Sequence, residues 1–324
     1  MSLKLGISSY CLSRKIYAGD MTLFDVMDWA KEHDCDHMEV VPFGLPMTLE
    51  DGSPNHDFAK RVGEYADKIG LPLSAFSLNA CVIRPGDENE TKEEKYRKEI
   101  ERIEMIMDLA YEMGIRKMRH DTCTGQHPLG TEYHTPEQFE EDFPTIVRAV
   151  KEVADYAASK GMRTTLENHG RYVNGADRLI RIIKAAGKDN VGMTMDVGNF
   201  LCVNEDPVTA VQKTIGYANM IHLKDFYIRK TDRMYPQKRV RPTTPEEWHT
   251  MLPSLAYVGT NAADYQLLRG AIIGQGDMDM WKIISIIKNS GYDQEISLEF
   301  EGMEDCIAGT TYGLETARYI WERV

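Results

Sequence analysis

Four residues with metal-binding side chains come at the ends of four successive apolar segments in the second half of the chain. They are Glu167, Asp196, His222 and Glu299. Three carboxylates in one pocket repel one another unless a cation or protons compensate their charge. Three oxygen donors with one imidazole suit Mn²⁺, Mg²⁺, Co²⁺ or Zn²⁺. We therefore expect one divalent metal ion here, provided that the fold brings the four segments together.

Short apolar segments alternate with longer amphipathic segments from one end of the chain to the other. The short segments predict eight strands, over Leu3–Ser9, His37–Val41, Leu73–Asn79, Lys117–Asp121, Arg163–Asn168, Val191–Asp196, Met220–Asp225 and Glu295–Glu301. The long segments predict eight helices, over Leu23–His33, His56–Ile69, Lys92–Met113, Pro136–Lys160, Ala176–Ala186, Pro207–Ala218, Met278–Asn289 and Cys306–Arg323.

This alternation is typical of a parallel sheet with right-handed crossovers, and eight repeats allow the sheet to close into a barrel. No glycine-rich dinucleotide turn follows the first strand, which weakens the competing open, doubly wound sheet. We predict an α/β protein, a (β/α)₈ TIM barrel formed by residues 1–324 as a single domain. In such a barrel the active site lies at the C-terminal ends of the strands, which are ~4.8 Å apart, so the four residues can converge.

One segment interrupts the alternation. Residues 228–276 follow the seventh strand and carry Arg, Lys, Pro and Tyr without clear periodicity, apart from a short helix predicted over Trp248–Tyr257. In a barrel this insertion lies on the C-terminal face, where long loops act as lids, substrate clamps or oligomer contacts. Tyr235 and Arg269 are the residues of the insertion that we consider for a substrate contact.

Composition excludes several other classes of protein. The net charge of −13 argues against a general nucleic-acid binder, which must neutralise phosphates. No run of ~18 apolar residues is present to span a membrane. The first residues enter a strand-like pattern without the features of a signal peptide, so we expect a cytoplasmic protein. Six cysteines are scattered singly, without a CxxC pair, and we interpret them as buried thiols.

Further polar residues near the predicted strand ends are expected to contact a substrate. Lys224 follows His222 by two residues and can face the same pocket, or pair with Asp225 or another acid. His169 follows Glu167 by two residues and can contact substrate or support a ligand. The remaining expected contacts are Glu39, His120, Asn199 and Glu301, with Asn79 and Asn168 as weaker candidates for binding hydroxyl groups.

The strand-end motifs resemble those of the xylose-isomerase-like barrel superfamily, which includes sugar isomerases, tagatose 3-epimerase-like enzymes, inosose dehydratases and endonuclease IV. The motifs are Leu-Glu-Asn-His from Leu166, Asp-Val-Gly-Asn from Asp196, His-Leu-Lys-Asp from His222, Gly-Gln-Gly-Asp from Gly274 and Gly-Tyr-Asp from Gly291. The resemblance extends over nearly the whole chain and is strongest from Arg163 onward.

By position, this resemblance assigns the metal ligands to Glu167, Asp196, His222 and Glu299. It implies Mn²⁺, Zn²⁺, Co²⁺ or Mg²⁺ as cofactor, with Mn²⁺ favoured. It also makes Glu167 and Glu299 the acid/base pair on the two faces of the substrate. Glu301 shares a strand face with Glu299 and competes with it for the ligand role; we prefer Glu299, which directly follows the apolar residues of the strand.

The resulting expectation is a metal-dependent isomerase or epimerase that acts on a small sugar through an enediolate, with a dimer or tetramer expected from the family. A lyase that uses the same intermediate and then expels a β-substituent stays open. Phosphodiester hydrolysis is a remote alternative, because Asn199 stands three residues after Asp196 where a histidine would be needed. A non-catalytic sugar-binding protein would be expected to lack one of the four metal ligands, and here none is missing.

Overall fold

The computed structural model describes residues 2–230, 258–259 and 266–324. Within them, eight parallel strands close into a barrel in the order β1-β11-β7-β6-β5-β4-β3-β2. Their bounds are Leu5–Ser8 (β1), Met38–Val40 (β2), Leu73–Leu78 (β3), Lys117–His120 (β4), Arg163–Glu167 (β5), Val191–Asp196 (β6), Ala218–Leu223 (β7) and Ile296–Leu298 (β11). The predicted TIM barrel is confirmed.

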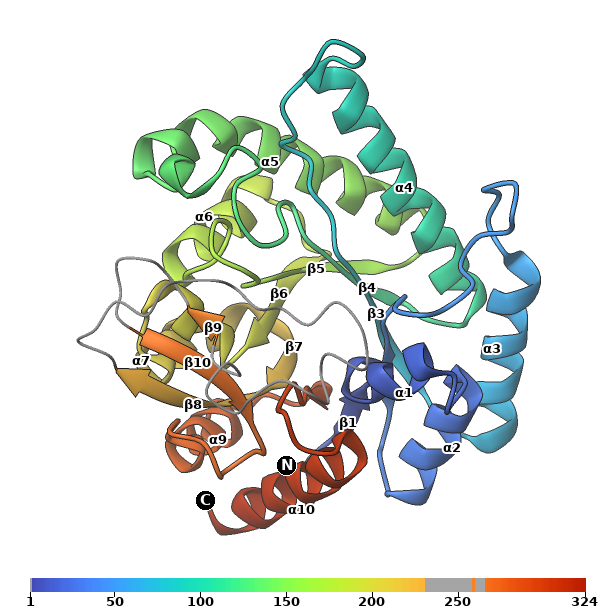
Figure 1. Cartoon of the computed structure of the whole chain (residues 1–324), viewed down its shortest axis with the longest axis vertical. Coiled ribbons are helices and arrows are strands. Elements are labelled where there is room, and N and C mark those ends of the chain that lie inside the picture. The colour runs from blue at the N-terminus through green and yellow to red at the C-terminus, as the bar shows by residue number, and fades with distance from the viewer. Residues whose placement is uncertain (1, 231–257, 260–265) are drawn as a thin grey trace.

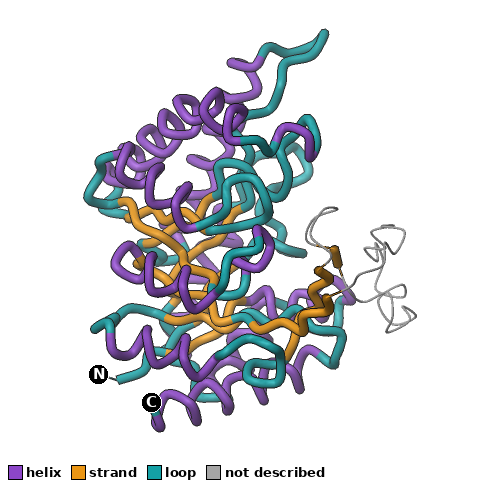
Figure 2. The backbone as a smooth tube through the Cα atoms, turned by 90° about the vertical axis from the view of Figure 1, so that its left-hand side faces the viewer, coloured by secondary structure: helices purple, strands orange, loops and turns teal. Residues whose placement is uncertain are grey.

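Helices surround the barrel, as the predicted crossovers require (Figure 1). They are α2 (Leu23–Glu32), α3 (His56–Ile69), α4 (Lys92–Glu112), α5 (Pro136–Ser159), α6 (Ala176–Ala186), α7 (Pro207–Thr214), α9 (Met280–Asn289) and α10 (Cys306–Arg323). A short segment of 3₁₀-helix (Ser9–Leu12) and helix α1 (Ser13–Ala18), neither of them predicted, follow β1. The chain ends lie near one another (Figures 1 and 2).

Helix boundaries follow from local capping chemistry. Thr22 and Thr91 each begin a helix as part of a capping box, with Asp25 and Glu94 as the reciprocal partners. Helix α7 ends at Thr214 and a 3₁₀ turn over Ile215–Tyr217 follows, so the seventh strand starts earlier than predicted. This strand therefore ends at Leu223, and its last residues are aligned with the ends of the neighbouring strands.

The described part of the insertion is more regular than the sequence suggested. Strand β8 (Asp225–Lys230) pairs antiparallel with β10 (Gln266–Ala271), which also pairs with β9 (Val258–Gly259). This small sheet extends from the barrel (Figure 2). The expectation of an irregular segment over 228–276 was wrong for these strands. Hydrogen bonds between their backbones hold them together, and such pairing leaves no amphipathic pattern in the sequence. Tyr235 lies outside the described residues, and so does the helix predicted over Trp248–Tyr257.

Candidate metal and active site

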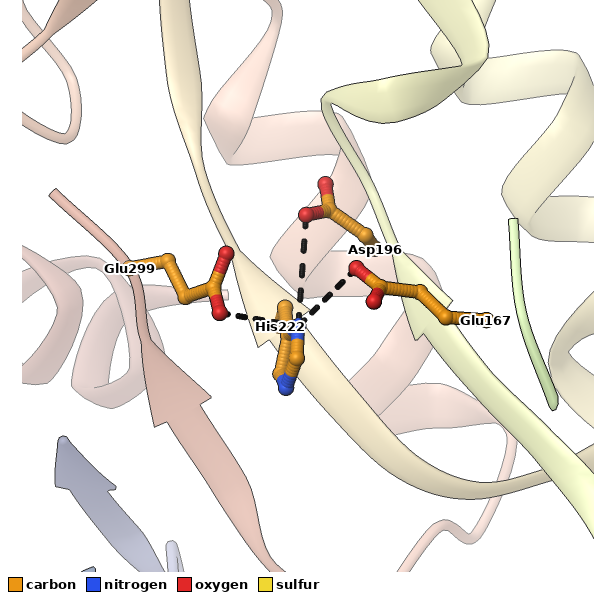
Figure 3. A group of neighbouring side chains, drawn as sticks. All are labelled: Glu167, Asp196, His222 and Glu299. Carbon is orange, nitrogen blue, oxygen red and sulfur yellow. Dashed lines mark hydrogen bonds and ion pairs between the residues drawn. The ribbon is translucent and has the colours of Figure 1, made fainter. Parts of the chain in front are cut away.

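The four predicted ligands converge at the mouth of the barrel (Figure 3). Glu167 and Asp196 are the last residues of β5 and β6, and His222 is the penultimate residue of β7. Asp196 pairs in register with His222, and the amide of Glu299 donates to the carbonyl of Leu223 at 2.9 Å. Neighbouring strand ends therefore hold the four side chains at the same level.

The imidazole of His222 lies at the centre of the cluster. Its Nδ1 atom is 3.3 Å from Glu167 Oε1, 3.4 Å from Glu299 Oε1 and 3.9 Å from Asp196 Oδ2. One donor atom from each of the four residues lies within 4.8 Å of the other three, and all four side chains are buried or nearly so. This donor set fits a divalent cation.

Asp196 gives a more specific indication. Its Oδ1 atom accepts hydrogen bonds from the backbone amides of Gly198 at 2.8 Å and Asn199 at 2.9 Å, which fix the carboxylate. Its Oδ2 atom is buried and accepts no hydrogen bond, although Lys224 Nζ is 2.9 Å away as an ion-pair partner. A buried carboxylate with one oxygen fixed by two amides and the other directed at the neighbouring donor atoms suits a metal ligand.

The opposite nitrogen of His222 has a different partner. Nε2 is 2.9 Å from Oε2 of Glu39, whose carboxylate also accepts a hydrogen bond from the Ser77 hydroxyl. The side chains of Glu39 and His222 are fully buried. A carboxylate at Nε2 holds a proton there, so Nδ1 is the nitrogen available to bind a cation in the cluster. Glu39 was expected to contact substrate; here it contacts the imidazole, and a substrate contact stays a prediction.

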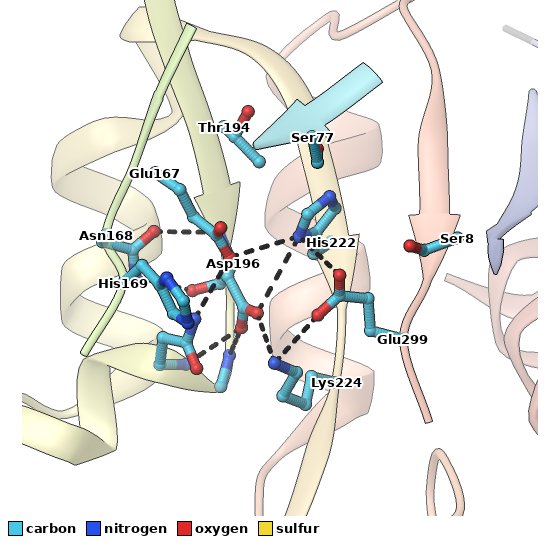
Figure 4. Close-up of polar contacts among 12 residues, drawn as sticks. Ser8, Ser77, Glu167, Asn168, His169, Thr194, Asp196, His222, Lys224 and Glu299 are labelled. Carbon is cyan, nitrogen blue, oxygen red and sulfur yellow. Dashed lines mark hydrogen bonds and ion pairs between the residues drawn. The ribbon is translucent and has the colours of Figure 1, made fainter. Parts of the chain in front are cut away.

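Two buried cations compensate the carboxylates. Lys224 Nζ lies 2.9 Å from both Asp196 Oδ2 and Glu299 Oε2 (Figure 4). Arg119, on β4, forms an ion pair with Glu167 and lies 3.0 Å from Asp121 Oδ1. Lys224 thus faces the pocket and also forms salt bridges with acids other than Asp225, while a contact with substrate stays a prediction. Asp225 instead accepts hydrogen bonds from the backbone amides of Phe226, Gly274 and Gly276.

These charges shift the proton affinities within the cluster. Burial, together with Glu167 and Glu299, raises the pKa of Asp196 to about 6 despite Lys224. Burial would also raise the pKa of Glu167, but Arg119 and His169 hold it well below its usual value. Burial opposes protonation of His222, yet the neighbouring carboxylates raise its pKa well above the ordinary range. Without a metal ion, a proton on His222 therefore offsets part of the negative charge, and a bound cation would replace it.

The other predicted contacts lie around the cluster. His169 Nδ1 is 2.8 Å from Asp121 Oδ2, and this partly exposed side chain reaches the barrel mouth. Asn199 is buried and donates from Nδ2 to Glu167 Oε1 at 3.2 Å. His120 is buried, with Nδ1 3.4 Å from the carbonyl of Asp121, and burial lowers its pKa to about 4. Asn199 contacts the cluster directly and His169 contacts Asp121 beside it, while the roles of all three side chains toward a substrate stay predictions.

Glu301 lies at the edge of the site. Its side chain is 31% exposed against 11% for Glu299, and its nearest cation, Lys224, is 3.9 Å away. Strand β11 ends at Leu298, so neither glutamate belongs to the ideal strand that the sequence suggested. The geometry therefore favours Glu299 as the fourth ligand. Arg269 pairs with Glu304 at 2.8 Å.

Sequence analysis did not single out Arg119 or Asp121, which together hold Glu167 and His169. One signal was present in the sequence: Lys117 and Arg119 are charged residues two positions apart within a predicted barrel strand. Strands of a parallel barrel are buried on both faces, so a charged residue inside one needs a specific partner.

The chain belongs to the xylose isomerase-like TIM barrel family, whose model matches residues 27–320. Among curated proteins, inosose dehydratase from Clostridium perfringens is 20% identical over 185 residues, which are 57% of this chain and 56% of that relative. The matched part is therefore little more than half of that protein. Among the described residues, no helix is long and apolar enough to cross a membrane.

Two solved structures illustrate the range of the fold. L-ribulose 3-epimerase superposes with a TM-score of 0.66 at 17% identity, covering 99% of this chain and 98% of that one. The IOLI protein, solved with a bound zinc atom, superposes with a TM-score of 0.67 at 15% identity, covering 99% of each chain. At these identities the likeness establishes the fold alone. Family and structural neighbours thus include epimerases and dehydratases, and one of them holds zinc.

Proposed function

We propose that this chain is an enzyme that binds one divalent metal ion through Glu167, Asp196, Nδ1 of His222 and Glu299 and acts on a small carbonyl-containing carbohydrate. The observation that carries the proposal is the convergence of four donor atoms within 4.8 Å at the barrel mouth. When bound there, a divalent ion supplies Lewis-acid stabilisation of negative charge on substrate oxygens. Zinc in a structural neighbour supports a metal, while Mn²⁺ stays a prediction.

The first candidate reaction is isomerisation or epimerisation by the two glutamates. Glu167 and Glu299 lie on either side of His222 (Figure 3). Burial opposes ionisation of Glu299, but His222 and Lys224 lower its pKa, so its carboxylate is charged and ready to accept a proton. One glutamate removes the proton from the carbon beside the carbonyl. Return of a proton to the opposite face gives the epimer, and return to the neighbouring carbon gives the isomer.

The second candidate reaction is elimination of water from the same class of substrate. It has equal support, since the curated relatives include inosose dehydratases. Proton removal is the same, and a β-hydroxyl then leaves with a proton from an acid. His169 can supply that proton: it lies at the mouth beside Asp121, and although burial opposes protonation, Asp121 and Glu167 raise its pKa.

Metal content and isotope exchange together test the proposal. Elemental analysis is expected to find a divalent metal in the wild type, or after incubation with Mn²⁺, and none in a Glu167→Gln/His222→Ala double variant. Glu304→Gln, which changes a carboxylate outside the cluster, should retain the metal. The metal-loaded enzyme is then incubated in D₂O with ketoses, inososes and keto-glycosides.

Deuterium at the carbon beside the carbonyl in an epimer or isomer supports the first reaction. A product that has lost water supports the second. Failure of the wild type to bind any divalent metal, even with excess Mn²⁺, contradicts the proposal, and metal binding without exchange on the whole panel contradicts its substrate class.

A further inference from the structure

Cys81 and Cys123 face each other across an isolated antiparallel bridge between the segments that follow β3 and β4. The residues beside them exchange two backbone hydrogen bonds, Val82 N to Thr122 O at 2.9 Å and Thr124 N to Ala80 O at 3.0 Å. Because these hydrogen bonds join the neighbours of the cysteines and not the cysteines themselves, Cys81 and Cys123 are a non-hydrogen-bonded pair. In such a pair the Cα atoms are about 4.5 Å apart and the side chains lie on one face. Disulfides require Cα separations of about 4.4–6.8 Å, so this backbone already has the geometry for one.

The two thiols interact directly and differ in environment. Cys81 is partly exposed, whereas Cys123 is buried. A hydrogen bond with Cys123 lowers the pKa of Cys81, although burial opposes this, and the same contact raises the pKa of Cys123. Of the two thiols, Cys81 is thus the one that ionises more readily and is the more exposed, as an attacking thiolate must be.

The other cysteines provide an internal comparison. Burial raises the pKa of each of them, to about 12 for Cys35 and Cys202 and in the same direction for Cys11 and Cys306. The sequence alone suggested six equivalent buried thiols. The structure separates one pair from the rest, because only the fold brings positions 81 and 123 side by side.

We propose that Cys81 and Cys123 form a reversible redox modification site that uses a hydroperoxide as oxidant. The Cys81 thiolate attacks one peroxide oxygen, the O–O bond breaks, and Cys81 becomes a sulfenic acid as hydroxide leaves. The Cys123 sulfur then attacks the Cys81 sulfur, its proton goes to the departing hydroxyl group, and water leaves. In total, two thiols and hydrogen peroxide give one disulfide and two waters; the sulfurs are oxidised and the peroxide oxygens are reduced.

The modification site is linked to the candidate active site through a single neighbouring residue. The Thr124 hydroxyl lies 2.5 Å from Asp121 Oδ2, and Asp121 holds Arg119 and His169. A disulfide therefore fixes the segment that carries Asp121, at the rim between β3 and β4.

Peroxide titration of the reduced wild-type protein tests this proposal without any assay of turnover. After oxidation, free thiols are alkylated under denaturing conditions and the peptides are mapped by mass spectrometry. We expect a Cys81–Cys123 disulfide that dithiothreitol reverses, while Cys11, Cys35, Cys202 and Cys306 remain alkylated. The oxidised protein should also melt at a higher temperature than the reduced one, because the cross-link restricts the unfolded chain.

Variants separate the roles of the two sulfurs. Cys123→Ser should accumulate a sulfenic acid at Cys81 that dimedone traps, and Cys81→Ser should leave Cys123 unmodified. Cys202→Ser, which changes another partly buried cysteine, should form the disulfide as the wild type does. The proposal is overturned if excess peroxide gives no linked peptide from folded wild type, or if Cys81 reacts no faster than Cys202. The wild-type mapping decides this even if a serine variant fails to fold.

Discussion

Glu39 and His222 meet across the interior of the barrel, with Oε2 2.9 Å from Nε2 and both side chains fully buried. They come from β2 and β7, which are separated in the barrel by β1 and β11. The contact therefore depends on barrel closure and not on the pairing of adjacent strands. It directs the other imidazole nitrogen toward the three carboxylates of the candidate metal site.

Removal of the Glu39 carboxylate should weaken metal binding. We expect Glu39→Ala to lower Mn²⁺ affinity by about 10–100-fold, because the carboxylate fixes the tautomer and orientation of the proposed ligand His222. Glu39→Gln, which keeps a hydrogen-bond acceptor, should lose less. Isothermal titration calorimetry measures both. Glu112→Ala is the matched control, since it breaks the surface His56–Glu112 pair of 3.0 Å; equal affinities in Glu39→Ala and this control would contradict the proposed role.

Replacement of Lys224 should destabilise the metal-free protein. Lys224→Met leaves the buried carboxylates of Asp196 and Glu299 without their cation, and we expect a loss of about 3 kcal/mol in the free energy of unfolding. Added Mn²⁺ should stabilise the variant more than the wild type, because the unpaired carboxylates attract it more strongly. Urea unfolding with and without Mn²⁺ measures both effects.

Lys213→Met provides the control for this variant, since Lys213 forms an exposed ion pair with Asp177 at 2.7 Å. It should unfold close to the wild type. If Lys224→Met were as stable as the wild type without metal, the role of Lys224 as the compensating cation would be wrong.

The ligand that follows β11 can be identified by a pair of variants. Glu299→Gln should lose Mn²⁺ affinity by more than Glu39→Ala does, because it removes a proposed ligand. Glu301→Gln should stay near the wild-type value, since this more exposed side chain lies outside the cluster, with Tyr10 and Lys224 beside it. Calorimetry and elemental analysis check both variants, and the reverse order would assign the ligand role to Glu301.

Acid should destabilise the metal-free protein partly through His120. Burial lowers its folded pKa to about 4, below the value of ~6.5 expected in the unfolded chain. The unfolded state therefore binds more protons as pH falls below ~6.5, and stability decreases until about pH 4. The difference between the two pKa values corresponds to a loss of roughly 3 kcal/mol in the free energy of unfolding.

His120→Gln should remove this part of the pH dependence, so its free energy of unfolding should fall less than that of the wild type between pH 7 and 4.5. Urea unfolding of both proteins in the presence of a chelator measures the difference. Parallel curves would show that His120 does not titrate as expected.

Much of the site could be predicted because both the barrel and its active face follow from local patterns. Alternation of apolar and amphipathic segments gave the strand order, and a parallel barrel places all strand ends on one face. A residue such as Asp196, at the end of a predicted strand, was therefore placed without knowledge of any contact. Strand seven was predicted two residues late at each end. The preceding α-helix ends at Thr214 and the 3₁₀ turn after it ends at Tyr217, and periodicity does not encode this local geometry.

Side-chain contacts between different strands and loops could not be predicted in this way. The Arg119–Glu167 pair, the Glu39–His222 bond and the Cys81–Cys123 bridge join residues that are 48, 183 and 42 positions apart. Sequence patterns report which face of an element is buried, but not which side chain it meets there. That choice depends on barrel closure, strand register and the packing of the mouth.

The sequence by itself therefore determined the barrel, the mouth as the place of chemistry and the four residues considered as ligands. The tertiary structure decided which nitrogen of His222 faces the carboxylates and that Lys224 and Arg119 compensate their charge. It also decided that Glu299 lies in the cluster while Glu301 lies at its edge. The physical reason is that hydrophobic periodicity specifies burial, whereas charge pairing in a buried site depends on distances of a few ångströms between elements far apart in sequence.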